Sequence, residues 1–173
     1  MRISSSISFQ ARVLSALLAL CVLSGCASVK FIADYDEQID TGTTALQKDF
    51  ETFLVKLESS AKSDDGKVEG YGSNKPFYSA AKVSISGLRL RADAVERNSL
   101  TVRMFDKLRK NLDRMEKMHS STEGLTPREI RESLRGAFNA QFTAILTLEL
   151  AKKRGEKPDE TKAAAAPSQI NPE

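Results

Sequence analysis

The sequence lacks tryptophan altogether, and aromatic residues make up only 6% of its 173 residues. It has one histidine, His119, and two cysteines, Cys21 and Cys26, which both lie in the first 26 residues. No disulfide can therefore cross-link the rest of the chain, so a domain there must be stabilised by its own apolar core. One histidine cannot supply the paired histidines of a di-iron bundle, and we expect neither a metal nor another cofactor.

Strand patterns are almost missing too, because alternation of β-branched residues is confined to the short stretch Val83-Ser84-Ile85. Hydrophobic residues make up 40% and charged residues 28%, which is typical of a soluble helical domain. The formal charge is +3, and without Arg2 and Arg12 the chain has 24 basic and 23 acidic residues, a net +1. This balance favours no particular partner, and we expect no nucleic acid partner.

The first 25 residues have the three parts of a signal peptide. Arg2 and Arg12 supply the positive region, an eleven-residue apolar stretch runs from Val13 to Leu23, and small residues follow. The stretch is too short to remain as a membrane-spanning helix, which needs roughly 20 apolar residues. We therefore predict that residues 1–25 are a cleaved export signal.

The four residues Leu23-Ser24-Gly25-Cys26 end this segment and resemble the lipobox of bacterial lipoproteins at every position. The resemblance implies that a diacylglycerol is joined to the sulfur of Cys26, that cleavage precedes Cys26, and that the new amino group receives a fatty acyl chain such as palmitate. Two or three acyl chains give stable anchoring. Ala27, in place of Asp, resembles the signal for the outer membrane, with the domain facing the periplasm. The resemblance ends here, and no family is identified for the mature domain.

Apolar residues at helical spacing predict an all-α antiparallel bundle over residues 32–155, after a lipidated linker at 26–31 and before a disordered tail at 156–173. The first helix is expected from Ile32 to about Ser60, although Gly42 and nearby threonines could delay its start to about Thr44. Four carboxylates near its beginning suit the positive end of the helix dipole better than a cation site; they are Asp34, Asp36, Glu37 and Asp40.

Turn-forming residues then predict a long surface loop over 59–76, and Pro76 is expected at the first turn of the second helix. Gly87, with small residues nearby, predicts a place where another helix approaches closely. We expect Asn98 and Ser99 to break this helix and cap a third one that ends at His119.

A single helix over 76–119 is the alternative, giving three helices in place of four. It would be about 65 Å long against about 45 Å for its neighbours, so four helices of matched length are favoured. The fourth helix opens with the capping box Thr126-Pro127-Arg128-Glu129, and it closes with the basic turn Lys152-Lys153-Arg154 and the cap Gly155.

The sequence marks no catalytic set. His119 lies beside Ser120 and Ser121, but neither an orienting third group nor an oxyanion site is evident, and a histidine at a helix end more often contacts terminal carbonyls. We therefore do not expect an enzyme.

One charge pattern stands out in the third helix. Five basic residues recur at steps of four and three and should share one face; they are Arg103, Lys107, Lys110, Arg114 and Lys117. The partner of this face could be an anionic lipid, an acidic envelope protein, or residues 31–65 of the same chain. That segment contains nine acidic and three basic residues. A solvated face with acidic neighbours is the simpler interpretation.

The sequence thus favours a membrane-anchored, non-catalytic module of the cell envelope that binds a protein or another envelope component. The alternative is a carrier of a small ligand or lipid in a cavity between the helices, lined by the adaptable residues Met104, Met115 and Met118. The oligomeric state is left open.

Overall fold

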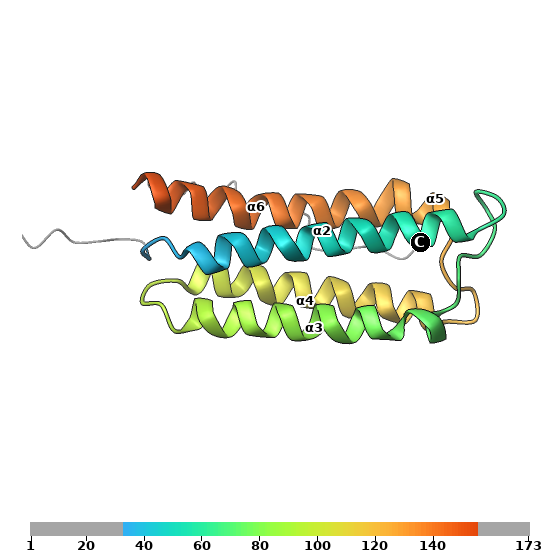
Figure 1. The fold of residues 1–173 in the computed structure, drawn as a ribbon, viewed down its shortest axis with the longest axis horizontal. Coiled ribbons are helices and arrows are strands. Elements are labelled where there is room, and N and C mark those ends of the chain that lie inside the picture. The colour runs from blue at the N-terminus through green and yellow to red at the C-terminus, as the bar shows by residue number, and fades with distance from the viewer. Residues whose placement is uncertain (1–32, 156–173) are drawn as a thin grey trace, which may run out of the picture. The chain divides into compact units, whose positions relative to one another are not determined.

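The computed structural model describes residues 33–155, which form an antiparallel bundle of four helices (Figure 1). The first three are α2 (Glu37–Ser60), α3 (Tyr71–Asp93) and α4 (Ser99–Ser120). The fourth is a continuous run of α5 (Pro127–Glu129), the π-helical turn η1 (Ile130–Leu134) and α6 (Arg135–Arg154). No strand occurs among the described residues. The predicted all-α class and the four-helix count are confirmed.

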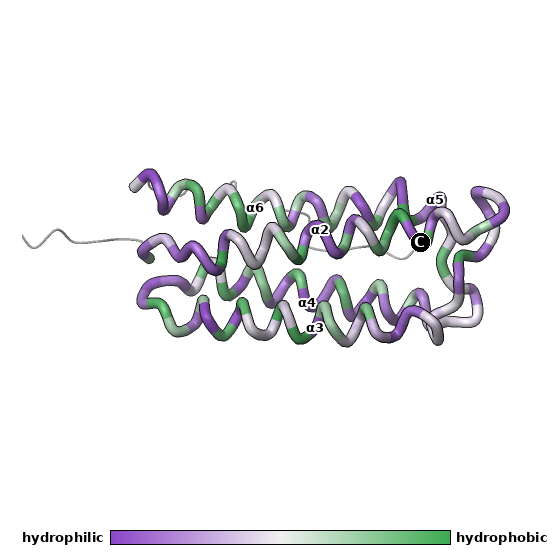
Figure 2. Tube along the Cα trace, in the orientation of Figure 1, coloured by the Kyte–Doolittle hydropathy of each residue, from purple (hydrophilic) through white to green (hydrophobic). Residues whose placement is uncertain are grey.

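Each helix packs against two others. Contacts join α3 with α4, α2 with α6, α2 with α3, and α4 with α6, so that α2 and α4 lie across the bundle from one another. Hydrophobic residues recur along every helix in Figure 2, as expected when each helix turns one apolar stripe toward a shared core. This is the up-and-down order that short connections impose.

The core is centred on aromatic rings. The Phe50 ring of α2 is 4.8 Å from that of Phe138 and 5.2 Å from those of Phe77 and Phe142. Phe50, Phe138 and Phe142 are fully buried, and each such side chain stabilises the fold by roughly 1.5–3 kcal/mol. A disulfide-free domain therefore has an apolar interior of its own.

The helical conformation is interrupted between α3 and α4, which rules out the single long helix over 76–119. Arg97 has a φ of 62°, a left-handed conformation that no continuing α-helix contains. Asn98 does precede α4 as expected, but its side chain does not cap the helix. It is buried and accepts a hydrogen bond from Lys152 Nζ at 2.6 Å. The predicted break is right, and the predicted cap is wrong.

Two helix starts differ from the sequence expectation. In α2 the Asp36 carboxylate accepts hydrogen bonds from the backbone N–H groups of Gln38 and Ile39, so the helix begins at Glu37, between the two expected starts. The helix α3 begins at Tyr71, and Pro76 lies inside it. The loop is therefore 61–70, shorter than the predicted 59–76.

This loop is attached to the α4–α5 connection. The Val68 N–H donates to the Leu125 carbonyl at 3.0 Å, and the Arg128 N–H donates to the Asp64 carbonyl at 3.3 Å. Arg128 also pairs with Asp65 at 2.8 Å. These contacts hold one end of the bundle together, so the loop is not a separate surface feature.

The capping box at Thr126 is present as predicted, since Thr126 Oγ1 accepts from the Glu129 N–H and Glu129 Oε2 accepts from the Thr126 N–H. The π-turn after it was not predicted. Its cause is the spacing of the buried residues Ile130, Leu134, Phe138 and Phe142, which recur every four positions. An α-helix would drift by about 40° at each such step, and the wider π-turn offsets part of that drift.

The C-terminal cap is confirmed by Gly155, which has a φ of 69°. The signal peptide, Cys26, the linker at 26–31 and the tail at 156–173 lie outside the described residues. Of the helices that are described, none has the length and hydropathy needed to cross a bilayer.

Candidate functional site

The five basic residues of α4 do share one face, which we call the basic face of α4: Arg103, Lys107, Lys110, Arg114 and Lys117. Arg103, Lys110 and Lys117 are exposed, and the other two are half-buried. At about 100° per residue, these positions point away from the buried residues Phe105, Leu108 and Leu112. The face therefore lies on the outside of the bundle, opposite the core-facing stripe.

The acidic residues of α4 lie toward α3 and form ion pairs with its basic residues. Asp106 pairs with Arg89 at 2.8 Å, Asp113 pairs with Lys82 at 3.3 Å, and Glu116 forms a very short contact with the same lysine. The hydrogen bond from Lys82 to Glu116 raises the pKa of Lys82, and a weaker contribution comes from the hydrogen bond to Asp113. Burial has the opposite effect but does not outweigh them. The charges of α4 are thus segregated: the acidic residues face α3, with Arg109 paired to Asp113, and the five residues of the basic face are turned outward.

The acidic residues of α2 and the following loop have other cationic partners. Asp36 pairs with Arg91, Glu51 and Glu58 pair with Arg135, and Asp64 pairs with Arg131. In the described part of the chain, no ion pair joins the basic face of α4 to residues 33–65 or to another acidic group. The acidic first-helix region is therefore not what lies opposite this face.

His119 is buried and links three segments. Its Nε2 lies 2.7 Å from the Glu69 carbonyl oxygen, and its Nδ1 lies 2.8 Å from the Tyr78 hydroxyl. Because a carbonyl only accepts, Nε2 must donate, and in the neutral ring Nδ1 then accepts from Tyr78. Burial raises the pKa of the Tyr78 hydroxyl, which keeps it protonated as this donor. The ring contacts no terminal carbonyl of its own helix, and the arrangement joins α3, α4 and the loop.

A second buried polar cluster was missed at the sequence level. Lys152 Nζ donates to Asn98 Oδ1 at 2.6 Å, to Thr101 Oγ1 at 2.8 Å and to Glu149 Oε1 at 2.5 Å. Lys152 was predicted only as part of the basic last turn of the fourth helix, and its side chain is 3% exposed. The signal was available, because positions 141, 145, 148 and 152 continue the core-facing period of α6.

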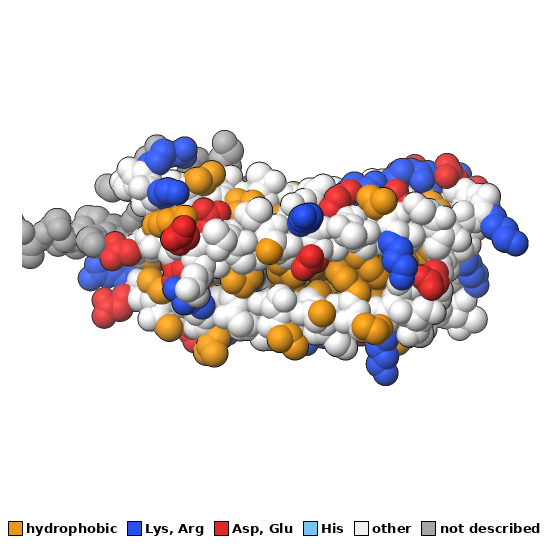
Figure 3. Space-filling model, viewed as in Figure 1, with side chains coloured by type: hydrophobic (Ala, Val, Ile, Leu, Met, Phe, Trp, Pro, Cys, Tyr) orange, Lys and Arg blue, Asp and Glu red, His pale blue; other side chains and the backbone are white. Residues whose placement is uncertain are grey.

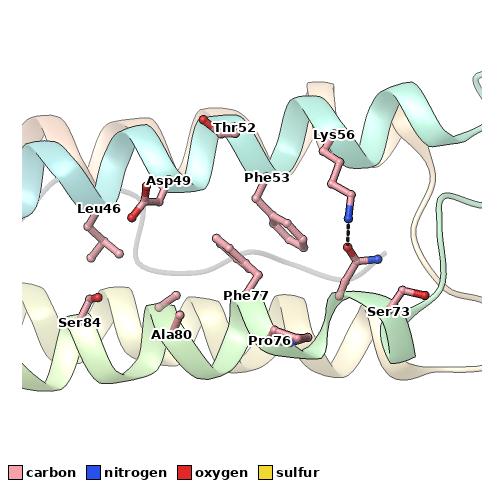
Figure 4. Close-up of a pocket in the computed structure, with 12 residues that line it drawn as sticks. Leu46, Asp49, Thr52, Phe53, Lys56, Ser73, Pro76, Phe77, Ala80 and Ser84 are labelled. Atoms are coloured by element: carbon pink, nitrogen blue, oxygen red, sulfur yellow. Dashed lines mark hydrogen bonds between the residues drawn. The ribbon is translucent and has the colours of Figure 1, made fainter.

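A groove runs between α2 and α3. One part of the groove has a volume of about 400 Å³, and the stacked rings of Phe53 and Phe77, 3.7 Å apart, help to line it. These rings point toward one another from the two helices in Figure 4, beside the hydrogen bond from Lys56 to Asn74. A second hollow of about 390 Å³ shares Leu46, Asp49 and Ser84 with the first. Neither is lined by a methionine, and Met104 and Met115 are buried.

The carboxylates near the start of α2 are held by protein groups. Asp36 caps the helix, and Asp40 accepts a hydrogen bond from the Tyr35 hydroxyl at 2.8 Å, which raises the pKa of Tyr35 to about 12. Within residues 33–155, no cluster of three or more histidine, cysteine or carboxylate side chains could hold a metal ion.

No protein-family model, curated protein or solved structure matches the chain. The function must therefore be argued from the lipobox-like segment and from the surfaces described above.

Proposed function

We propose that this protein is a lipid-anchored, non-catalytic module of the bacterial cell envelope that binds anionic lipid headgroups through the basic face of α4. The observation that carries the proposal is the segregation of charge on α4. Its acidic residues are paired with α3, whereas no described acidic group pairs with the five basic residues.

The geometry of the basic face suits a membrane surface. Its residues extend over about 21 Å along a straight helix, at a rise of 1.5 Å per residue. Neither hollow of the α2–α3 groove includes any of them, so they do not enclose a single small ligand. Each lysine or arginine near an anionic lipid surface contributes about 1 kcal/mol to the free energy of membrane binding. Five such residues bind weakly from solution but can hold a domain that is already tethered beside the membrane.

The lipobox-like segment supplies that proximity. Acyl chains on Cys26 would hold the domain beside the bilayer, and the tether would raise the effective concentration of lipid around α4. Replacing Cys26 with Ser should move the chain from the membrane fraction of a lipoprotein-producing host to the soluble fraction and abolish incorporation of labelled palmitate. Unchanged labelling and fractionation would refute the anchor.

The lipid interaction can be tested by lysine footprinting on the full, anchored chain. We would reconstitute it into vesicles of phosphatidylcholine alone or with phosphatidylglycerol, acylate the exposed amines, and measure each lysine by mass spectrometry. Lys107, Lys110 and Lys117 should react more slowly only in the anionic vesicles, and high salt should restore their reactivity because it screens the attraction.

Three exposed lysines outside α4 act as internal controls: Lys48, Lys62 and Lys75. Their reactivity should be equal in both kinds of vesicle. Equal labelling of the α4 lysines in both vesicles would refute the lipid proposal. If protection instead required membranes of the producing cell and disappeared after protease treatment, the partner would be an acidic protein.

A carrier of small apolar ligands is the second candidate, and the α2–α3 groove is the observation that favours it. Its walls include Leu46, Phe53, Phe77 and Ala80. Native mass spectrometry of the purified full chain should show a retained ligand if this candidate is right, and the mass of the chain alone would count against it.

A further inference from the structure

The outward side of α3 carries no charge over most of its length. Six residues form this surface, which we call the outer face of α3: Pro76, Ser79, Ala80, Val83, Gly87 and Leu90. All six are exposed, and Val83 and Leu90 are 72% and 68% exposed. In Figure 3, hydrophobic side chains follow α3 and line the hollow between it and α2. Single exposed apolar residues are ordinary, but a row of them without charge marks a contact surface.

The charged residues of α3 are turned elsewhere. Lys82 and Arg89 pair with acidic residues of α4, and Arg91 pairs with Asp36 beside α2. Lys75 and Asp93 lie about 90° around the helix from the centre of the outer face. The helix therefore places its charges on its two flanks and leaves the outer face without them.

Gly87 is the second observation. A Cβ added there would meet no atom within 4 Å, and its φ is not positive, so neither packing nor backbone conformation within the bundle requires glycine. A glycine in a helix interior costs about 1 kcal/mol relative to alanine. Gly42 differs, because a Cβ there would come within 2.6 Å of Leu88 Cδ2. The close helix approach expected at Gly87 is thus not made inside the bundle.

We propose that the outer face of α3 is the interface of a homodimer, in which α3 of one copy packs antiparallel against α3 of a second copy. The order of residue sizes supports this arrangement. With Val83 on the two-fold axis, Ser79 lies opposite Gly87 of the second copy, and Pro76 lies opposite Leu90 of the second copy. Small residues then meet on either side of the paired Val83 side chains, and the larger Pro76 and Leu90 lie beyond them.

Two further features favour a second copy over an unrelated chain. A face without charge lets two molecules of equal net charge meet without local repulsion, since like charges placed opposite one another disfavour a contact. The face also carries both the protruding and the small residues that the contact needs, so it complements itself under two-fold symmetry. It shares no residue with the basic face of α4, and the dimer does not depend on lipid binding.

The first test is sedimentation of the purified full chain in mild detergent over a range of concentrations. The parent chain should form a dimer, and Val83→Glu should remain monomeric with unchanged helical circular dichroism. Val55→Glu is the matched control, because Val55 is an exposed valine on α2, 48% exposed and outside the face. A monomeric parent chain, or equal behaviour of the two variants, would overturn the proposal.

The second test is disulfide cross-linking in membranes before solubilisation. Val83→Cys should form a covalent dimer under mild oxidation, whereas the parent chain and Thr143→Cys, at an exposed position on α6, should not. Cross-linking of Thr143→Cys to the same extent would show random collision. If Val83→Cys formed no covalent dimer, and if Val83→Glu also abolished the protection of the α4 lysines in anionic vesicles, the outer face of α3 would contact the membrane. That result would also overturn the proposal.

Discussion

At the scale of single residues, the ion pair of Lys152 with Glu149 has the greatest consequence for one end of the bundle. Both residues are buried, and the pair joins α6 to Asn98 and Thr101 at the start of α4. A buried ion pair adds little net stability, but loss of one partner leaves the other charge buried and unpaired.

We therefore expect Lys152→Met to lower the free energy of unfolding by about 3–5 kcal/mol. The double change Lys152→Met with Glu149→Gln should recover much of that loss, because no uncompensated charge remains. Urea unfolding followed by circular dichroism measures both effects. Lys153→Met is the control: Lys153 is exposed, and its ammonium lies 5.0 Å from the centre of the Tyr35 ring, so this change should cost no more than about 1 kcal/mol. Additive losses in the double variant would contradict the ion-pair argument.

Asp36 gives the protein a pH dependence of known sign. Burial alone would raise its pKa, but hydrogen bonds from Arg91 and from the backbone N–H groups of Gln38 and Ile39 together lower it below 3.8. A lowered folded-state pKa means that the ionised carboxylate stabilises the fold at pH above about 4, near its ordinary value, and that this stabilisation is lost as pH falls through the folded-state pKa.

Asp36→Asn can still cap α2 but cannot titrate. We expect it to be less stable than the parent chain at pH 7 and to lose less stability between pH 5 and pH 2.5. Thermal unfolding across this range measures the difference, with Asp49→Asn on the exposed side of α2 as the control. A parallel pH profile in Asp36→Asn and the parent chain would show that Asp36 contributes nothing to acid sensitivity.

At the scale of helices, two glycines separate intrinsic helix preference from packing. Gly136 lies in α6 with open space where a Cβ would be, whereas the corresponding space at Gly42 in α2 is filled by Leu88. Gly136→Ala should raise the free energy of unfolding by up to about 1 kcal/mol, which is the ordinary helix preference of alanine.

Gly42→Ala should gain less than Gly136→Ala or lose stability, because the Leu88 side chain must move away from the new methyl group. Chemical denaturation of the two variants side by side measures the contrast. An equal gain at both positions would show that Leu88 reorients at no cost.

Sequence patterns predicted the positions of the helices better than any other feature of the fold. Apolar spacing located all four helices, and the capping box at Thr126 and the glycine cap at Gly155 fixed the ends of the last one. The start of α3 was wrong by five residues because Pro76 suits a first turn, whereas in the structure it is the sixth residue of the helix, where it has no N–H to donate to the Gly72 carbonyl. The π-turn at Ile130–Leu134 was missed because steps of four, mixed with steps of three further along at positions 138, 141, 145 and 148, also fit one face of an ordinary helix.

At the scale of the whole domain, we expect residues 33–155 to unfold as one cooperative unit. Every helix packs against two others around one core, and rings from α2, α3 and α6 meet at Phe50. Far-ultraviolet circular dichroism reports the helices, and tyrosine fluorescence of a variant with Tyr35→Phe and Tyr71→Phe reports Tyr78 alone at the α3–α4 contact. The two signals should give the same transition in urea. A tyrosine transition that precedes the loss of helix would show that α3 and α4 separate first.

The sequence by itself determined the helical class, the lipobox-like segment and the alignment of five basic residues on one face, and it favoured four helices over three. These depend on local spacing, which the period of a helix converts directly into position. Only the tertiary structure decided that the acidic residues of α4 pair with α3, that Lys152 is buried against Asn98, and that Gly87 faces outward. Each of these depends on which helix lies beside which, and neighbours in space are fixed by packing across the whole bundle.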